Sequence, residues 1–186
     1  MKNLFSKLDK CAGFTLVETL VAISIFTMSL VAVMSLLGQG VADTNFAKNK
    51  VTAEYLAQEG IEYTRYMRDT YVISQQNGWA EFYDIILDSE GGLGCADEDG
   101  CIFDPAVMTY IPCTSAWCQD VPLKYDSFSG NYHYASGNNT IFSRQIKAES
   151  ISGTTEEVKI TSTVSWRQGS STQHVSFSEI LFDWVE

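Results

Sequence analysis

An unbroken apolar stretch near the N-terminus, Phe14 to Leu37, does most to constrain what this chain can be. It contains no Pro, Lys or Arg, and its only charged residue is Glu18. At 1.5 Å per residue, about 24 residues form a helix of about 36 Å, which is long enough to cross a bilayer. Positive residues precede it, so the positive-inside rule predicts an N-in, C-out membrane segment. Those residues are Lys2, Lys7 and Lys10.

Three kinds of targeting segment compete to explain this stretch. An ordinary cleaved signal peptide has an apolar core of about 7–15 residues followed by a small-residue cut site. The present stretch is longer, although Gly40-Val41-Ala42 could serve as a poor cut site. A plain signal anchor leaves Glu18 unexplained, because a carboxylate in hydrocarbon costs about 2.5–3.5 kcal/mol. The third kind is a segment whose short leader is cleaved off ahead of the apolar stretch, so that the stretch stays on the chain. This kind gives Glu18 a role.

The sequence Gly13-Phe14-Thr15-Leu16-Val17-Glu18 resembles the processing motif of type IV prepilins. The resemblance implies that a prepilin peptidase cuts after Gly13, removes residues 1–13 as a leader, and leaves Phe14 as an N-methylated N-terminus. Residues 14–37 then stay on the chain as a transmembrane and filament-core helix. The resemblance also implies that Glu18 pairs with the N-terminal amine of a neighbouring subunit. The simpler alternative is an acid placed favourably at the start of a helix.

The helix is expected to continue beyond the membrane, because no Pro occurs before Pro105. Residues 38–69 are expected to form an amphipathic second half that a globular head covers on one face, with a continuous helix from 14 to about 68. Gly38 and Gly40 make a weak point in it, and Gly60 allows another element to approach closely. The expected buried positions have helical spacing: Ala53, Leu56, Ala57, Gly60, Tyr63, Tyr66 and Met67.

Two segments are similar to PilV-type minor pilins. The first is Leu56 to Glu62 with Arg65 and Arg68-Asp69, in the second half of the helix. The second runs from Phe142 through Val164-Ser165-Trp166 to Trp184. These resemblances favour a minor pilin over a major one.

Residues 70–128 form an acidic region rich in Gly and Pro, expected to be mostly loops. The four cysteines that remain after loss of Cys11 with the leader all lie here: Cys95, Cys101, Cys113 and Cys118. An even count in an exported chain predicts two disulfides, for which four cysteines allow three connectivities. The local pairs Cys95–Cys101 and Cys113–Cys118 are favoured, and a crossed pairing stays open.

Metal binding is a less favoured explanation for the cysteines and acidic residues of this region than disulfides and a solvated turn. Five residues separate Cys95 from Cys101 and four separate Cys113 from Cys118, whereas zinc sites usually have two to four in both pairs, and the expected compartment oxidises thiols. The run Asp97-Glu98-Asp99-Gly100 with nearby Asp104 is a calcium candidate, but it lacks the alternation of an EF-hand loop, so a solvated acidic turn is favoured. We therefore expect no cofactor.

Residues 129–186 are expected to form an antiparallel β-sheet. Val158, Ile160, Ser162, Val164 and Trp166 alternate with polar residues, a period of two that is typical of a half-buried strand. Further strands are expected from Phe142, from Val175 to Trp184, and around Tyr132 and Tyr134. The expected turns are Gly137-Asn138-Asn139, Ser152-Gly153 and Gln168-Gly169-Ser170. The fold class is therefore α+β, type IV pilin-like, with the sheet packed on the second half of the long helix.

Charge and composition limit the function. The formal net charge of −11 disfavours nucleic acid as a partner. No nucleophile elbow or phosphate-binding glycine loop occurs, and the two histidines, His133 and His174, lie far apart, so an enzyme is not expected.

We expect a minor pilin of a type IV pilus-like filament. Before cleavage it is expected to be a single-pass protein of the bacterial inner membrane with a cytoplasmic N-terminus, and after assembly part of an extracellular filament. The expected partners are the prepilin peptidase and other pilins. A pseudopilin of a type II secretion or DNA-uptake system and a membrane-anchored extracellular adhesive domain remain alternatives.

Overall fold

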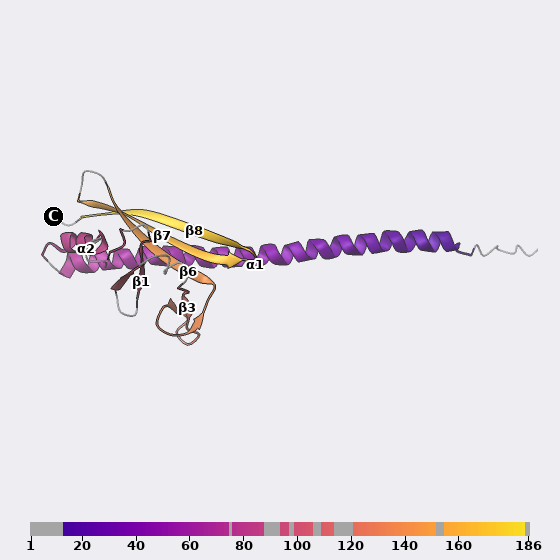
Figure 1. Ribbon diagram of the computed structural model, residues 1–186, viewed down its shortest axis with the longest axis horizontal. Helices are drawn as coiled ribbons and strands as arrows, with labels where there is room; N and C mark the ends of the chain where they lie inside the picture. The colour runs from indigo at the N-terminus through magenta and orange to yellow at the C-terminus, as the bar shows by residue number, and fades with distance from the viewer. Residues whose placement is uncertain are drawn as a thin grey trace, which may run out of the picture. The chain divides into compact units, whose positions relative to one another are not determined.

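The computed structural model describes residues 13–74, 76–87, 94–96, 99–105, 109–113, 121–151 and 155–184. The chain divides into two units, Met1–Asn45 and Phe46–Glu186. Helix α1, Leu16–Ser74, contributes to both (Figure 1). Four features of the sequence analysis lie outside the described residues: most of the leader, Asp97-Glu98, Cys118 and the expected turn at Ser152-Gly153.

In the first unit, the described structure is the beginning of α1. The helix is regular through both Gly38 and Gly40, and a Cβ atom placed on either glycine would meet nothing within 4 Å. The two glycines therefore lie inside a helix here, and neither serves a close contact with another element.

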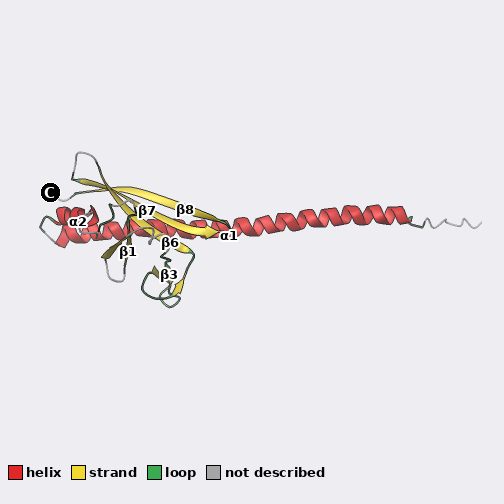
Figure 2. Ribbon diagram, in the orientation of Figure 1, coloured by secondary structure: helices red, strands yellow, loops and turns green. Residues whose placement is uncertain are grey.

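The second unit contains two antiparallel sheets and a short helix, α2, Gly78–Leu87 (Figure 2). The larger sheet has the strand order β2-β1-β6-β7-β8. Its strands are β1 (Cys101–Asp104), β2 (Thr109–Pro112), β6 (Phe142–Ser150), β7 (Glu157–Gln168) and β8 (Ser171–Phe182). The smaller sheet, β4-β3-β5, consists of β3 (Lys124–Tyr125), β4 (Tyr132–His133) and β5 (Asn138–Asn139).

The core lies between the large sheet and the second half of α1. The predicted alternation in β7 is confirmed, since its apolar members and Ser162 are all buried and the residues between them are only half-buried. Ile61 and Met67 of α1 pack in one cluster with Ile146 and Ile160. A second cluster joins the beginning of this half of α1 to the other end of the strands: Ala53, Leu56, Ala57, Leu123, Phe142, Val164 and Trp166. The α+β class and the packing of helix on sheet are confirmed.

Several details differ from the sequence predictions. Helix α1 runs to Ser74 rather than to residue 69, and Tyr66 is 56% exposed instead of covered by the head. Region 70–128 contains α2 and a hairpin, β1–β2, that adds two strands to the predicted meander β6–β7–β8. Asn138–Asn139 pairs with β3 as a strand, and the turn comes just before it, at Gly137 with φ 106°. Strands β1, β2 and β5 are short, so local periodicity carries little information about them.

Candidate functional site

The predicted processing site lies immediately ahead of helix α1. Gly13 is exposed and so is Phe14, whose side chain is 81% accessible, and neither is helical. Thr15 caps the helix: its side-chain oxygen accepts a hydrogen bond from the Glu18 N–H at 3.3 Å, and its carbonyl accepts one from the Thr19 N–H at 3.2 Å. The peptide bond between Gly13 and Phe14 therefore lies ahead of the helix between two exposed residues, where a peptidase can reach it.

The apolar part of α1 exposes its side chains on every side. All residues from 14 to 37 are exposed, including large side chains such as Leu16 at 80% and Met28 at 76%. This helix is the one described helix long and apolar enough to cross a membrane. A contiguous apolar surface of this size is suited to contact with a bilayer or with other apolar helices.

Four of the six hydroxyl groups within this apolar stretch donate to backbone carbonyls of the helix itself. Ser24 donates to the Leu20 carbonyl at 2.8 Å, Ser29 donates to the Phe26 carbonyl at 2.7 Å, and Thr19 and Thr27 make equivalent bonds. Such bonds to the preceding turn let Ser and Thr enter hydrocarbon without an unpaired donor.

Glu18 is different from these residues. It is the first-turn acid of α1, and among the described residues its carboxylate pairs with no cation. Its position three residues after Thr15 has the spacing of a capping box, and the helix dipole also favours an acid there. Neither effect neutralises the charge, and a charged carboxylate is costly among apolar side chains unless it is paired.

The second half of α1 contains a buried cation that the sequence analysis missed. Arg144 of β6 is about 1% exposed and donates through Nη1 to the Leu56 carbonyl at 3.1 Å and to Glu59 Oε2 at 2.8 Å. The Tyr63 ring lies 5.5 Å from its guanidinium carbon. The alternation of β6 could have revealed it, since Arg144 falls on the same face as Phe142 and Ile146.

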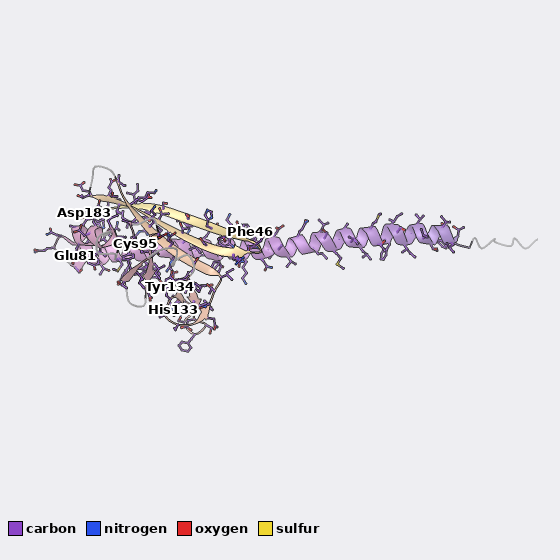
Figure 3. All side chains as sticks on the ribbon, in the orientation of Figure 1. Phe46, Glu81, Cys95, His133, Tyr134 and Asp183 are labelled. Carbon is purple, nitrogen blue, oxygen red and sulfur yellow. A yellow bond between two sulfur atoms is a disulfide. The ribbon has the colours of Figure 1, made fainter. Side chains whose placement is uncertain are left out.

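The Glu59 carboxylate links this cation to a tyrosine. Its Oε1 accepts a hydrogen bond from the Tyr63 hydroxyl at 2.9 Å. Burial raises the pKa of Tyr63 to about 12, and the adjacent negative charge of Glu59 adds to the increase. The Tyr134 hydroxyl, from the loop after β4, donates to the Arg144 carbonyl at 3.2 Å (Figure 3 labels Tyr134). Arg144 therefore joins α1, the large sheet and the region of the small sheet.

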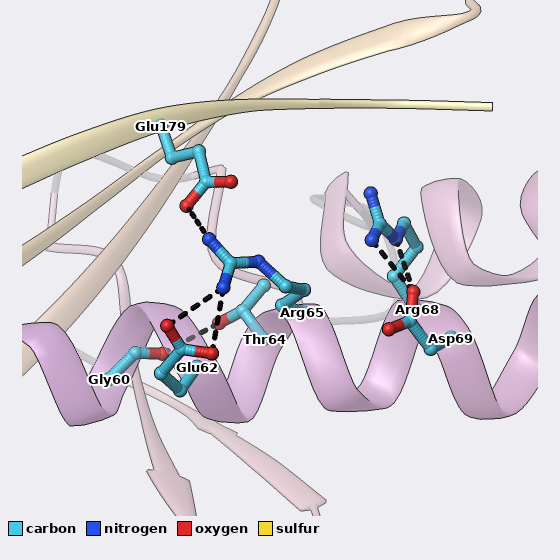
Figure 4. Close-up of polar contacts among 7 residues, drawn as sticks. All are labelled: Gly60, Glu62, Thr64, Arg65, Arg68, Asp69 and Glu179. Atoms are coloured by element: carbon cyan, nitrogen blue, oxygen red, sulfur yellow. Dashed lines mark hydrogen bonds and ion pairs between the residues drawn. The ribbon is translucent and has the colours of Figure 1, made fainter. Parts of the chain in front are cut away.

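Partly exposed ion pairs lie on the next turns of α1. Arg65 donates to Glu62 on its own helix at 2.8 Å and to Glu179 of β8 at 2.6 Å, and Arg68 pairs with Asp69 at 2.7 Å (Figure 4). The Arg65–Glu179 pair connects the helix to the outermost strand, β8. Pairs this accessible contribute little, typically below about 1 kcal/mol each.

One predicted disulfide is present in the described residues. Cys95 and Cys101 are bonded and lie six positions apart in the sequence. The Cys95 N–H donates to the Ile86 carbonyl of α2, and its carbonyl accepts from the Ala148 N–H of β6, so the bridge fixes the segment between these elements. Cys113 is also disulfide-bonded, whereas Cys118 lies outside the described residues. Within the part of the chain that the structure describes, no group of three His, Cys, Asp or Glu side chains gathers as metal ligands.

The two histidines lie in different sheets. His133 is in β4, where its Nδ1 accepts a hydrogen bond from the Ser136 N–H at 3.3 Å, and His174 is in β8. Neither stands beside a nucleophile with which it makes a hydrogen bond among the described residues. The residues with the strongest functional indications remain Gly13, Phe14 and Glu18.

Comparison with known proteins agrees with that emphasis. Residues 8–34 match the family model of the prokaryotic N-terminal methylation motif. The match covers the predicted cut site, Glu18 and most of the apolar stretch. No match is found among curated proteins or among solved structures.

Proposed function

We propose that this chain, which is type IV prepilin-like, is a minor pilin, a structural and assembly subunit of a type IV pilus-like filament. One observation carries the proposal: a single helix, α1, contains both the exposed apolar stretch and the helical residues that are buried in the core of the head. Cleavage after Gly13 leaves this helix intact, with its apolar half free to enter a bilayer or the centre of a filament. Pilins of the family that the sequence resembles are built in this way.

Processing creates the partner that Glu18 lacks. Cutting after Gly13 gives Phe14 a positive α-amine, four residues from Glu18 in the sequence. In a filament, the Glu18 carboxylate of one subunit pairs with the Phe14 amine of its neighbour. A paired charge in an apolar environment costs far less than an isolated one, so the pairing favours docking in one register.

The head is suited to a compartment outside the cytoplasm. The Cys95–Cys101 disulfide is of the kind that persists in oxidising environments, and the positive leader orients the N-terminus toward the cytoplasm before cleavage. The subunit would therefore wait in the inner membrane with its head outside, and then enter the filament with other pilins.

The experiment measures both processing and incorporation. The intact mass of the membrane-extracted chain should correspond to a start at Phe14 carrying one methyl group. The chain should also be recovered with sheared filaments, as a minor component of them. A mature start near Asp43, or absence from every filament fraction, would refute the proposal. If deletion of the chain abolishes protein secretion or DNA uptake and leaves pili intact, the chain is a pseudopilin instead.

A further inference from the structure

The outer face of the large sheet contains a hollow of about 300 Å³ at the β7–β8 turn. It is small for a ligand pocket, whose usual volume is about 300–1,000 Å³. Four of the residues that line it have hydroxyl groups and one is an arginine. These five are Ser143, Ser165, Arg167, Ser170 and Thr172.

Strand register gathers these side chains on one face. Ser143 of β6 lies directly opposite Ser165 of β7, and Arg167 of β7 lies directly opposite Thr172 of β8. The intervening Val164 and Trp166 are buried on the other face against α1. Directly opposed residues in an antiparallel pair share a face, so three strands supply neighbouring polar groups to one place.

The hydroxyl groups in the hollow are available for a ligand. Elsewhere on this face the hydroxyls bond to each other, as Thr161 does with Ser178 at 2.9 Å and Thr163 with Ser176 at 2.8 Å. Within the described residues, none of the four hydroxyls that line the hollow makes a side-chain hydrogen bond. Each of them can donate a hydrogen bond to a ligand in the hollow.

Arg167 gives the hollow a positive charge. It is exposed and makes no ion pair among the described residues, whereas Arg65, Arg68 and Arg144 are all paired with carboxylates. Among the described residues, no acidic side chain lines the hollow, although the formal net charge of the chain is −11. A guanidinium fork with several hydroxyl donors suits an oxyanion with three or four oxygens.

We propose that this hollow binds a phosphate group, with the headgroup of a membrane phospholipid as its source before assembly. Trp166, which is also among the residues that line the hollow, lies 6.2 Å between ring centroids from Phe46, at the beginning of the second unit. Eight residues, 38–45, separate Phe46 from the end of the apolar stretch, a length that spans at most about 30 Å. The choice of a lipid source rests on the proposed function, in which residues 14–37 hold the chain in a membrane. The phosphate site itself does not rest on the proposed function.

The first experiment tests the site with inorganic phosphate. The processed full chain, in an uncharged maltoside micelle, is labelled with ¹³C at the isoleucine methyls and titrated at constant ionic strength. The methyl of Ile141, which lines the hollow, should shift, and that of Ile180 on the same sheet should not. Arg167→Gln should weaken the apparent affinity at least tenfold. Lys159→Gln is the matched control, because it removes the same charge from the same face of β7.

The hydroxyl groups are tested separately from the charge. Thr172→Val and Ser165→Ala should each weaken phosphate binding severalfold and leave the methyl spectrum of the free protein otherwise unchanged. If Arg167→Gln and Lys159→Gln weaken the response equally, or if wild type shows no shift at Ile141, the hollow is not a phosphate site.

The second experiment identifies the source. The chain is placed in nanodiscs of phosphatidylglycerol or of a digalactosyl lipid that contains no phosphate. The Ile141 methyl should shift only in the phospholipid discs, and Arg167→Gln should abolish the shift. A response to inorganic phosphate without any response to phospholipid would overturn the lipid source and leave a site for a soluble phosphate.

Discussion

Gly60 of α1 lies directly against Ser162 of β7. A Cβ atom added to Gly60 would collide with the Ser162 hydroxyl and would lie 3.1 Å from Cδ of Arg144. Both residues are buried where the helix crosses the sheet. The close approach predicted at this glycine is therefore present, and it fixes the distance between the two layers of the head.

We predict that Gly60→Ala destabilises the head by about 1–3 kcal/mol, because the added methyl forces helix and sheet apart. The loss should appear even though Ala favours a helix by about 1 kcal/mol over Gly. Denaturant unfolding of the processed chain in micelles measures it. Gly40→Ala, whose methyl would meet nothing within 4 Å, is the control and should show no loss. Adding Ser162→Ala to Gly60→Ala should recover part of the stability, since the colliding oxygen is removed.

The Arg144–Glu59 pair supplies a second prediction. Glu59→Gln should destabilise the head, because it leaves a wholly buried guanidinium without its counter-charge. Loss of one partner from a fully buried pair costs about 3–5 kcal/mol, and the 32% exposure of the Glu59 side chain should bring the value below that range. Glu62→Gln is the matched control on the same helix: its 63% exposed carboxylate should contribute below about 1 kcal/mol. Equal losses in the two variants would show that the buried pair has no special role.

Alkaline pH should weaken the same region. The pKa of Tyr63 is raised from 10.0 to about 12 by burial and by Glu59, so folding favours the protonated phenol. Its contribution is therefore complete below pH 10 and is lost as the pH rises through about 12. Unfolding midpoints across that interval should fall less steeply in Tyr63→Phe than in wild type. Identical slopes would mean that the phenol does not titrate with folding.

Oxidation of the cysteines can be tested directly. Mass mapping of the exported chain without reductant should find no free thiol among Cys95, Cys101, Cys113 and Cys118, with Cys95 joined to Cys101 as in the structure and Cys113 joined to Cys118. Replacing Cys95 and Cys101 by Ser should cost about 2 kcal/mol, since the bridge closes a short loop. Recovery of four free thiols, or of bound zinc, would contradict this prediction.

The secondary structure of the head was predictable where the periodic pattern was long. The period of two from Val158 to Trp166 correctly gave both the strand and its buried face. Helix α2 was missed because Asn77-Gly78 suggested a turn. The turn is present, since Asn77 has φ 66°, and the helix begins directly after it, since the Asn77 carbonyl accepts a hydrogen bond from the Glu81 N–H. The spacing of Trp79, Phe82 and Ile86 was the available signal for that helix.

The candidate site was largely visible in the sequence, because Gly13, Phe14 and Glu18 form one local motif. Arg144 and the hollow beside Arg167 were not, since each depends on the pairing of strands and helix that are distant in the chain. Local patterns specify which face a residue takes, but not which residue of another element it meets.

Glu18→Ala should separate assembly from every earlier step. The change removes a charge from the apolar stretch, so membrane insertion should be unimpaired or slightly better, and Ala is the best helix former. The Thr15 cap uses the backbone N–H of residue 18 and should survive. Cleavage after Gly13 should survive as well, since Gly13 and Phe14 are unchanged and accessible.

What Glu18→Ala removes is the counter-charge for the Phe14 amine of a neighbouring subunit, which leaves a cation in an apolar environment. The variant should therefore be processed, stable and held in the membrane, yet poorly recovered in filaments. Glu18→Gln keeps hydrogen-bonding capacity without charge and should fail nearly as badly. The measurement is the ratio of subunit in sheared filaments to processed subunit in the membrane. Normal recovery of Glu18→Ala would reduce Glu18 to a favourable acid at a helix start, because no uncompensated amine could then have been created.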